Sequence, residues 1–174
     1  MRLHGFDYSV SGAYHITICT VNREKILWKD LSHFDAEDWK ANLSEIGKIV
    51  DRQINNENGH KEITVDNYVI MPDHVHLLIF ADACDDTRNV RRPFPARPGA
   101  QPINTTDGTA DGKINELQNS RIPHYIGTLK RFTNREIGEN IWQKSYHDVI
   151  IRDREEYIQI WDYIENNPRN PYDE

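Results

Sequence analysis

Apolar and polar residues follow two periods along the chain, one of two residues and one of three to four. Alternation with many β-branched residues predicts strands over 14–21, 63–71, 74–80 and 141–151. Apolar residues three or four apart predict amphipathic helices over 35–57 and 123–138 and a last helix that begins after Asp153 and ends before Pro168. Asp153, followed three residues later by Glu156, is typical of a helix N-cap.

The predicted order is strand, helix, strand, strand, helix, strand, followed by one more helix. This order indicates an α+β protein with a ferredoxin-like, split βαβ fold, in which helices cover one face of an antiparallel sheet of four to five strands. The other face is left to host a site. The length of 174 residues suits a single domain, residues 1–174.

One long segment has no apolar period. Residues 81–120 are rich in proline and glycine and carry basic side chains between Arg88 and Arg97. This composition predicts a long mobile loop, which is either functional or simply disordered.

The charge of the chain is acidic overall, with a formal net charge of -7. That value speaks against a simple nucleic-acid binder, because lysine and arginine contacts to phosphate normally dominate such binding. Residues 113–152, however, hold seven Lys and Arg against four Asp and Glu. This basic stretch is either a nucleic-acid face or a solvated surface.

Hydropathy and cysteine content bear on the cellular compartment in which the protein is expected. No apolar run approaches the roughly 20 residues that span a bilayer, the first ten residues lack a signal-peptide pattern, and two cysteines provide no disulfide framework. We therefore expect a cytoplasmic protein with no membrane partner.

Two histidines open the second of the central strands, directly after the Met71-Pro72-Asp73 turn. His74 and His76 are two residues apart, so their side chains leave the strand on the same face and form half of a metal site. A single His-x-His pattern also arises easily by chance, and histidines are common on sheet surfaces.

The last predicted helix has a second polar face. Tyr157, Trp161 and Ile164 cluster on one side, whereas Tyr163 and Asn167 share another side, four residues apart. The phenol of Tyr163 and the amide of Asn167 could thus point into the same site. The alternative interpretation is that Tyr163 is one of eight tyrosines and that Asn167 only ends the helix before Pro168.

Several ordered blocks together resemble the REP-associated tyrosine transposases, which are relatives of the single-tyrosine insertion-sequence transposases of the HUH (His-hydrophobic-His) group. The blocks lie at residues 5–9, 12–14, 17–20, 22–24, 68–76, 129–133, 141–143, 150–153 and 163–168. They cover nearly the whole chain outside residues 81–120.

The resemblance implies a metal-dependent nuclease that cleaves single-stranded DNA near a hairpin. It assigns His74 and His76 to a divalent metal, Tyr163 to the nucleophile that forms a 5′-phosphotyrosine, and Asn167 to a third ligand position. Mg²⁺ or Mn²⁺ is the expected ion, and Zn²⁺ stays open for an isolated histidine pair. Phosphate contacts are expected from five basic residues, each of which could equally be a solvated side chain: Lys130, Arg131, Arg135, Lys144 and Arg152.

The chain also departs from the family pattern. Asp148-Val149 stands where relatives commonly have a Glu-His pair, so any role of that histidine in placing DNA is absent or has moved to His147. We expect a monomer or homodimer, with Tyr163 meeting the histidine pair of its own chain. Two other functions stay open: a non-catalytic nucleic-acid-binding module on the same fold, and a metal-dependent hydrolase without a covalent intermediate.

Overall fold

A computed structural model describes residues 12–30, 38–57, 63–81 and 121–169 of the chain. Four strands form one antiparallel sheet in the order β2-β3-β1-β4. They are β1 (Gly12–Cys19), β2 (Ile63–Ile70), β3 (His74–Ala81) and β4 (His147–Ile151). The order and pairing are those of the split βαβ fold, so the predicted fold class is confirmed. The predicted loop at 82–120 and the motif at 5–9 lie outside the described residues.

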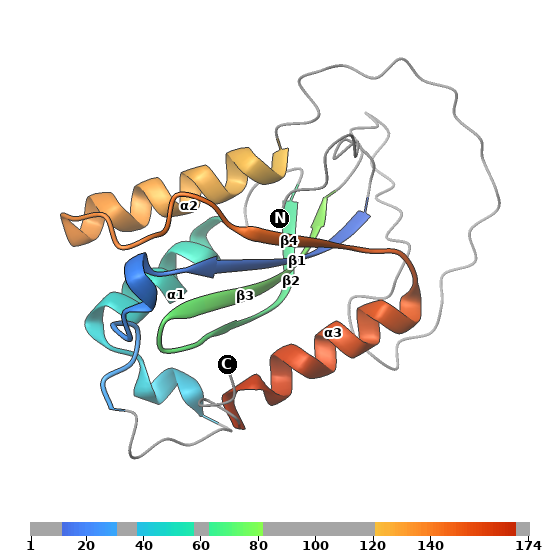
Figure 1. Ribbon diagram of the computed structural model, residues 1–174, viewed down its shortest axis with the longest axis horizontal. Coiled ribbons are helices and arrows are strands. Elements are labelled where there is room, and N and C mark those ends of the chain that lie inside the picture. The colour runs from blue at the N-terminus through green and yellow to red at the C-terminus, as the bar shows by residue number, and fades with distance from the viewer. Residues whose placement is uncertain (1–11, 31–37, 58–62, 82–120, 170–174) are drawn as a thin grey trace.

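In the part of the chain that the structure describes, three α-helices flank this sheet: α1 (Glu45–Glu57), α2 (Arg121–Ile137) and α3 (Arg154–Asn166). Helices α1 and α2 pack together on one side of the sheet, and α3 lies across the other side (Figure 1). Tyr68 of β2 points to the side that α1 and α2 cover, and its hydroxyl contacts Asp51 and Asn55 of α1. The side chains of β3 are buried along its whole length, since helices cover this central strand on both faces.

The first helix is shorter than its sequence pattern predicts. Residues 39–42 form a separate 3₁₀ turn, and α1 begins only at Glu45. Leu43 pairs with Trp28 in an isolated β-bridge, and the Ser44 hydroxyl accepts from the backbone N–H of Gly47. The break therefore exists because residues 28 and 43 pair in the tertiary structure and Ser44 caps the N-terminus of α1.

The last strand is also shorter than predicted. Only residues 147–151 pair with β1 as a strand, whereas Trp142 makes a single bridge to Thr20. Residues between them are held by Lys130 of α2, whose ammonium group donates to the carbonyls of Gln143 and Ser145. The backbone N–H of Gln143 also donates to the carbonyl of Cys19, so the Lys130 bonds add to the backbone pairing near Trp142.

Helix ends agree with the sequence signals. The Asp153 side chain accepts from the backbone N–H of Glu156 and caps α3. Gly138 follows α2 with a φ of 89°, a conformation that glycine adopts at little cost. Helix α2 begins at Arg121, two residues before the predicted start, because Pro123 is tolerated inside the first turn, where its missing N–H leaves no helical hydrogen bond unmade.

Candidate active site

His74 and His76 project from β3 toward α3. Both side chains are only 3% exposed. On the neighbouring strand β1, Cys19 pairs with His74 and Thr17 pairs with His76, so residues of both strands share this face. The two-residue period predicted from the sequence thus places the histidine pair as expected.

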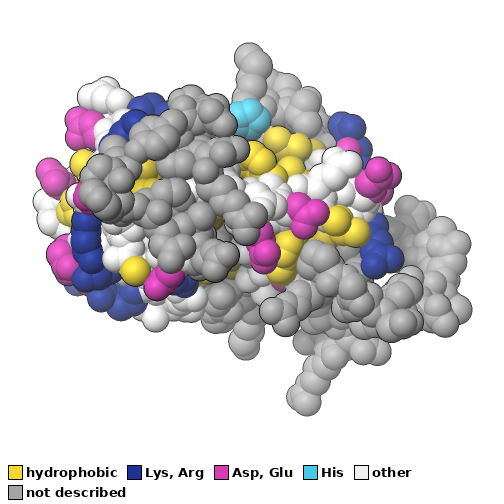
Figure 2. All heavy atoms as spheres, turned by 90° about the horizontal axis from the view of Figure 1, so that it is seen from below, with side chains coloured by type: hydrophobic (Ala, Val, Ile, Leu, Met, Phe, Trp, Pro, Cys, Tyr) yellow, Lys and Arg dark blue, Asp and Glu magenta, His cyan; other side chains and the backbone are white. Residues whose placement is uncertain are grey.

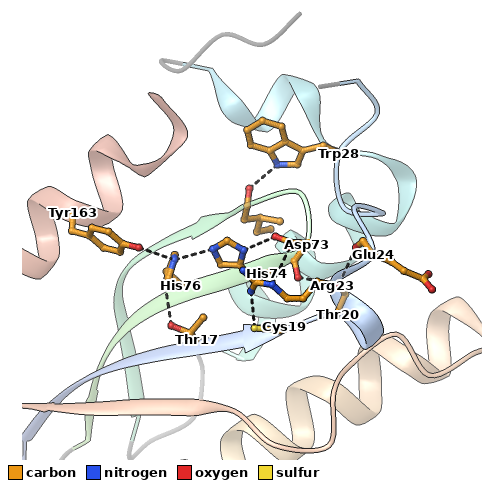
Figure 3. Close-up of polar contacts among 11 residues, drawn as sticks. Thr17, Cys19, Thr20, Arg23, Glu24, Trp28, Asp73, His74, His76 and Tyr163 are labelled. Atoms are coloured by element: carbon orange, nitrogen blue, oxygen red, sulfur yellow. Dashed lines mark hydrogen bonds and ion pairs between the residues drawn. The ribbon is translucent and has the colours of Figure 1, made fainter. Parts of the chain in front are cut away.

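The two imidazole rings converge through their Nε2 atoms, which lie 3.0 Å apart (Figure 3). Two nitrogens bound to one ion at about 2.1 Å are about 3.0 Å apart when the angle at the ion is about 90°. The pair therefore fits two adjacent positions of an octahedral divalent ion. Within the described ranges no group of three or more His, Cys, Asp and Glu side chains is arranged to hold a metal.

His74 is oriented by the residue before it. Its Nδ1 lies 2.6 Å from Oδ1 of Asp73, and Oδ2 of the same carboxylate accepts from Nε of Arg23 at 3.1 Å (Figure 3). Burial by itself would raise the pKa of Asp73, but the hydrogen bond and charge of His74 and the charge of Arg23 hold it below its ordinary value. An ionised carboxylate only accepts, so the Nδ1 of His74 carries the hydrogen.

Arg23 reaches this carboxylate from an unusual backbone. Asn22 and Arg23 have φ values of 54° and 58°, which place both in the left-handed region. Asparagine tolerates this region better than most residues, whereas for arginine it is costly, and such conformations cluster at functional sites. The turn brings the Arg23 guanidinium within 3.0 Å of the Cys19 sulfur as well as onto Asp73.

His76 has two different neighbours at its other nitrogen. Its Nδ1 lies 3.0 Å from Nε2 of His15 and 3.1 Å from Oγ1 of Thr17, both on β1. Burial, followed by the charges of His74, His15 and Arg23, lowers the pKa of His76 to about 2. His76 is therefore a neutral imidazole at physiological pH.

Tyr163 of α3 points at this cluster. Its hydroxyl is 3.3 Å from Nε2 of His76, and its ring meets that of His76 edge-on at 5.2 Å. The side chain is 40% exposed, whereas Tyr157, Trp161 and Ile164 of the same helix are buried. Tyr163 and the histidine pair thus lie together within one chain, and the phenol is accessible to solvent.

The third predicted ligand, Asn167, follows α3 directly. Its backbone N–H donates to the carbonyl of Tyr163, one turn earlier. The side chain is half-buried. Its role as a ligand stays a prediction.

The five basic residues predicted to contact DNA are dispersed. Arg131 and Arg135 are exposed on α2, which lies across the sheet from α3 (Figure 1). Lys144 is exposed before β4, and Arg152 is exposed between β4 and α3, close in sequence to the tyrosine helix. Lys130 is half-buried, and its ammonium donates to two backbone carbonyls, each at 2.9 Å. Of the five, Arg152 leads directly into the helix of Tyr163.

Sequence reasoning assigned no site role to His15, Thr17, Arg23 or Asp73. The alternation of β1 shows that residues 15 and 17 share a face, but nothing local says that this face meets His76. Asp73 could have been found from its position beside a candidate ligand, since ligating histidines commonly donate to a carboxylate.

One of the comparisons with known proteins supports this fold. No protein-family model matches the chain. A solved structure of a REP-associated tyrosine transposase bound to a REP hairpin aligns with 98% of this chain and 73% of its own length, with a TM-score of 0.58 and 15% identity. The chain has the fold of that transposase. A presumed transposase from Deinococcus radiodurans aligns with 95% of this chain and 96% of its own length at 18% identity, with a TM-score of 0.41.

A relative by sequence is an uncharacterised protein of Haemophilus influenzae. It is 28% identical over 170 residues, which cover 97% of this chain and 86% of that protein. Separately, none of the helices within the described ranges combines the length and apolar character needed to cross a bilayer.

Proposed function

We propose that this chain is a metal-dependent tyrosine endonuclease and strand transferase of the HUH transposase type, acting on single-stranded DNA beside a hairpin. The observation that carries the proposal is the meeting of Tyr163 with the histidine pair. Its hydroxyl lies 3.3 Å from one of two imidazole nitrogens that are themselves 3.0 Å apart. Hairpin DNA as the substrate rests on the transposase of shared fold, which was solved with a REP hairpin.

In this proposal His74 and His76 hold Mg²⁺ or Mn²⁺, with Asn167 as a further ligand. The bound ion supplies Lewis-acid polarisation of the scissile phosphate. Asp73 fixes His74, and the neutral state of His76 leaves a lone pair for the ion at physiological pH. α3 holds the phenol at the edge of the site, where a phosphate can reach it from solvent.

Cleavage then proceeds by nucleophilic substitution at phosphorus. The Tyr163 hydroxyl loses its proton as its oxygen forms a bond to phosphorus, the bond to the 3′ oxygen breaks, and the 3′ oxygen takes up one proton and leaves as a hydroxyl. The product is a 5′-phosphotyrosine, which a 3′ hydroxyl can later attack to rejoin strands. A free phenol has a pKa near 10, so only about one part in a thousand is ionised at pH 7 and the site must favour loss of its proton.

The distribution of basic and acidic side chains on the surface bears on how many phosphate contacts the protein can make. In Figure 2 the visible Lys and Arg side chains lie toward the two ends of the view, and acidic side chains lie both beside them and between them. Among the side chains of described residues that are visible in this view, the basic ones form no continuous stripe. We expect DNA affinity to come from a few phosphate contacts, Arg152 and Lys144 first, and from unpaired bases stacked on exposed aromatic rings.

The test is incubation of the protein with labelled single-stranded hairpin oligonucleotides and Mn²⁺, followed by denaturing electrophoresis. A covalent protein–DNA band should form and should disappear in Tyr163→Phe. Tyr157→Phe is the matched control, because it makes the same change on the same helix at a buried residue that contacts Asp66. Cleavage that persists without an adduct in Tyr163→Phe would indicate a water nucleophile. Hairpin binding without any reaction would indicate the binding module.

A further inference from the structure

We propose that Val149 of β4 packs against an unpaired base of the DNA strand next to the scissile phosphate, on a face that it shares with His15. The inference rests on the proposed function, because it names where part of the substrate lies. Its test measures DNA binding rather than cleavage, so it can hold or fail independently of the covalent chemistry.

Helix α3 leaves one half of the sheet face that carries the histidine pair uncovered. It packs mainly on β2 and β3, whereas β4 forms the edge of the sheet beyond β1. Thr17 pairs with His147 and His15 pairs with Val149, and directly paired residues point to the same face. Both β4 residues are exposed, and the β1 residues on this side are only partly buried. The β1–β4 face consists of His15, Thr17, Cys19, His147 and Val149.

Val149 is linked to the candidate nucleophile through one residue. Val149, 44% exposed, and Tyr163 are the exposed large apolar side chains among the residues that the structure describes. A single exposed valine is ordinary on a protein surface. Val149, however, pairs with His15, whose ring meets the ring of Tyr163 edge-on at 5.8 Å. The same His15 ring lies 3.0 Å from Nδ1 of His76, so the exposed valine is one strand away from the candidate site.

The chemistry of the β1–β4 face suits a nucleobase. None of its five side chains is a carboxylate, although the chain as a whole is acidic. Asp148 pairs with Ile16 and points to the opposite side of the sheet. Aromatic rings, including imidazole, stack on unpaired bases, and an aliphatic side chain adds apolar contact. Arg152 is exposed shortly after Val149, where it can contact a phosphate of the same strand.

The spacing of the strands is of the size of one nucleotide. β1 separates β4 from β3, and Val149 is offset from the row of His76 by two residues along the strand. Because adjacent strands lie about 4.8 Å apart and each residue advances about 3.4 Å, the backbones of these two residues are on the order of 12 Å apart. A nucleotide whose phosphate lies at His76 can therefore place its base against Val149.

The test combines a change in the protein with a change in the DNA. The probe is the hairpin oligonucleotide with single-stranded flanks that binds most tightly, prepared with an abasic residue at each flank position in turn. Affinities are measured with Mn²⁺ on the Tyr163→Phe protein, in which no adduct forms. Adding Val149→Ala should weaken binding of the intact oligonucleotide about 3- to 10-fold, as expected for lost apolar contact. The same substitution should have no effect when the abasic residue is next to the cleavage site.

Two further variants serve as controls. Val149→Ile keeps the apolar contact and should bind like the parent protein. Ile150→Ala shortens an aliphatic side chain of the same strand on the opposite face, and its effect should not depend on the position of the abasic residue. An equal loss for Val149→Ala at every abasic position would overturn the inference, as would unchanged affinity in a folded Val149→Ala protein.

The remaining outcomes separate this inference from the proposed function. If no hairpin oligonucleotide binds, both are wrong. If binding depends jointly on Val149 and the neighbouring base but the wild type forms no covalent adduct, the inference holds and only the proposed chemistry is wrong. Sedimentation of the DNA-free protein tests another occupant: a dimer that Val149→Asp dissociates would assign the β1–β4 face to a second copy of the chain and overturn the inference.

Discussion

Asp73 and His74, neighbours in sequence, bond to each other through their side chains, with Oδ1 of the carboxylate 2.6 Å from Nδ1 of the imidazole. This contact directs the other imidazole nitrogen, Nε2, at His76. Arg23 holds the same carboxylate from the far side at 3.1 Å. The orientation of the candidate ligand is thus set by a carboxylate that is itself anchored.

The first prediction concerns that anchor. Asp73→Asn removes the charge behind His74 and should weaken Mn²⁺ binding about 10- to 100-fold, as measured by titration calorimetry. Arg23→Gln leaves the carboxylate in place, so its effect should be smaller. Equal affinities for Asp73→Asn and the wild type would contradict a role of Asp73 at the ligand.

Substitution of Tyr163 should affect DNA cleavage without affecting ion binding. Tyr163→Phe removes the nucleophilic oxygen but neither imidazole, so covalent adduct formation should fall below detection while the Mn²⁺ dissociation constant changes less than about threefold. His76→Ala should abolish both. Loss of ion binding in Tyr163→Phe would show that the phenol is itself a ligand.

Acid should destabilise the fold through His76. Its pKa is lowered to about 2 in the folded protein by burial and nearby charge, whereas an unfolded histidine has a pKa near 6.5. Between those values the unfolded chain binds one more proton at this position. The contribution to stability is therefore complete above about pH 6.5 and declines as the pH falls, by up to about 1.4 kcal/mol per pH unit.

Urea unfolding between pH 7 and pH 4, with chelator present, measures this effect. His76→Gln carries no titrating group at this position, so its free energy of unfolding should depend less steeply on pH than that of the wild type. Parallel curves for the two proteins would show that His76 is protonated in the fold.

Two helical glycines should respond in opposite ways to alanine. A Cβ on Gly47 of α1 would lie 2.1 Å from the backbone carbonyl oxygen of Leu27, so Gly47→Ala must displace one of two packed backbones. Unfolding free energy should fall by more than about 3 kcal/mol. A Cβ on Gly127 of α2 meets nothing within 4 Å, and Gly127→Ala should stabilise by about 0.5–1 kcal/mol. Thermal melts of the two variants decide this.

Basic residues should divide into structural and DNA-binding groups. Lys130→Met loses two hydrogen bonds to backbone carbonyls and should lower the free energy of unfolding by about 1 kcal/mol, with little change in the salt dependence of hairpin binding. Arg152→Ala should leave stability within about 0.5 kcal/mol and reduce the salt slope by about one. If Lys130→Met instead reduces the salt dependence of hairpin binding, Lys130 contacts DNA.

Local periodicity was sufficient for much of this protein. The two-residue period of β3 places His74 and His76 on one face, and the helical period of residues 153–167 puts Tyr163 off the buried stripe of Tyr157, Trp161 and Ile164. The order of these elements was enough to predict the split βαβ sheet. Each of these features depends on residues a few positions apart, whose spacing is visible in the sequence.

Pairing between distant segments decided the rest. His15 meets His76 across 61 residues because β1 aligns against β3 in one register, and a shift by one residue would turn His15 away from the site. Likewise Leu43 pairs with Trp28 and interrupts the predicted helix, and Lys130 turns from solvent to the carbonyls of Gln143 and Ser145. Register and packing are set by the whole core, so the spacing of residues within one element does not reveal them.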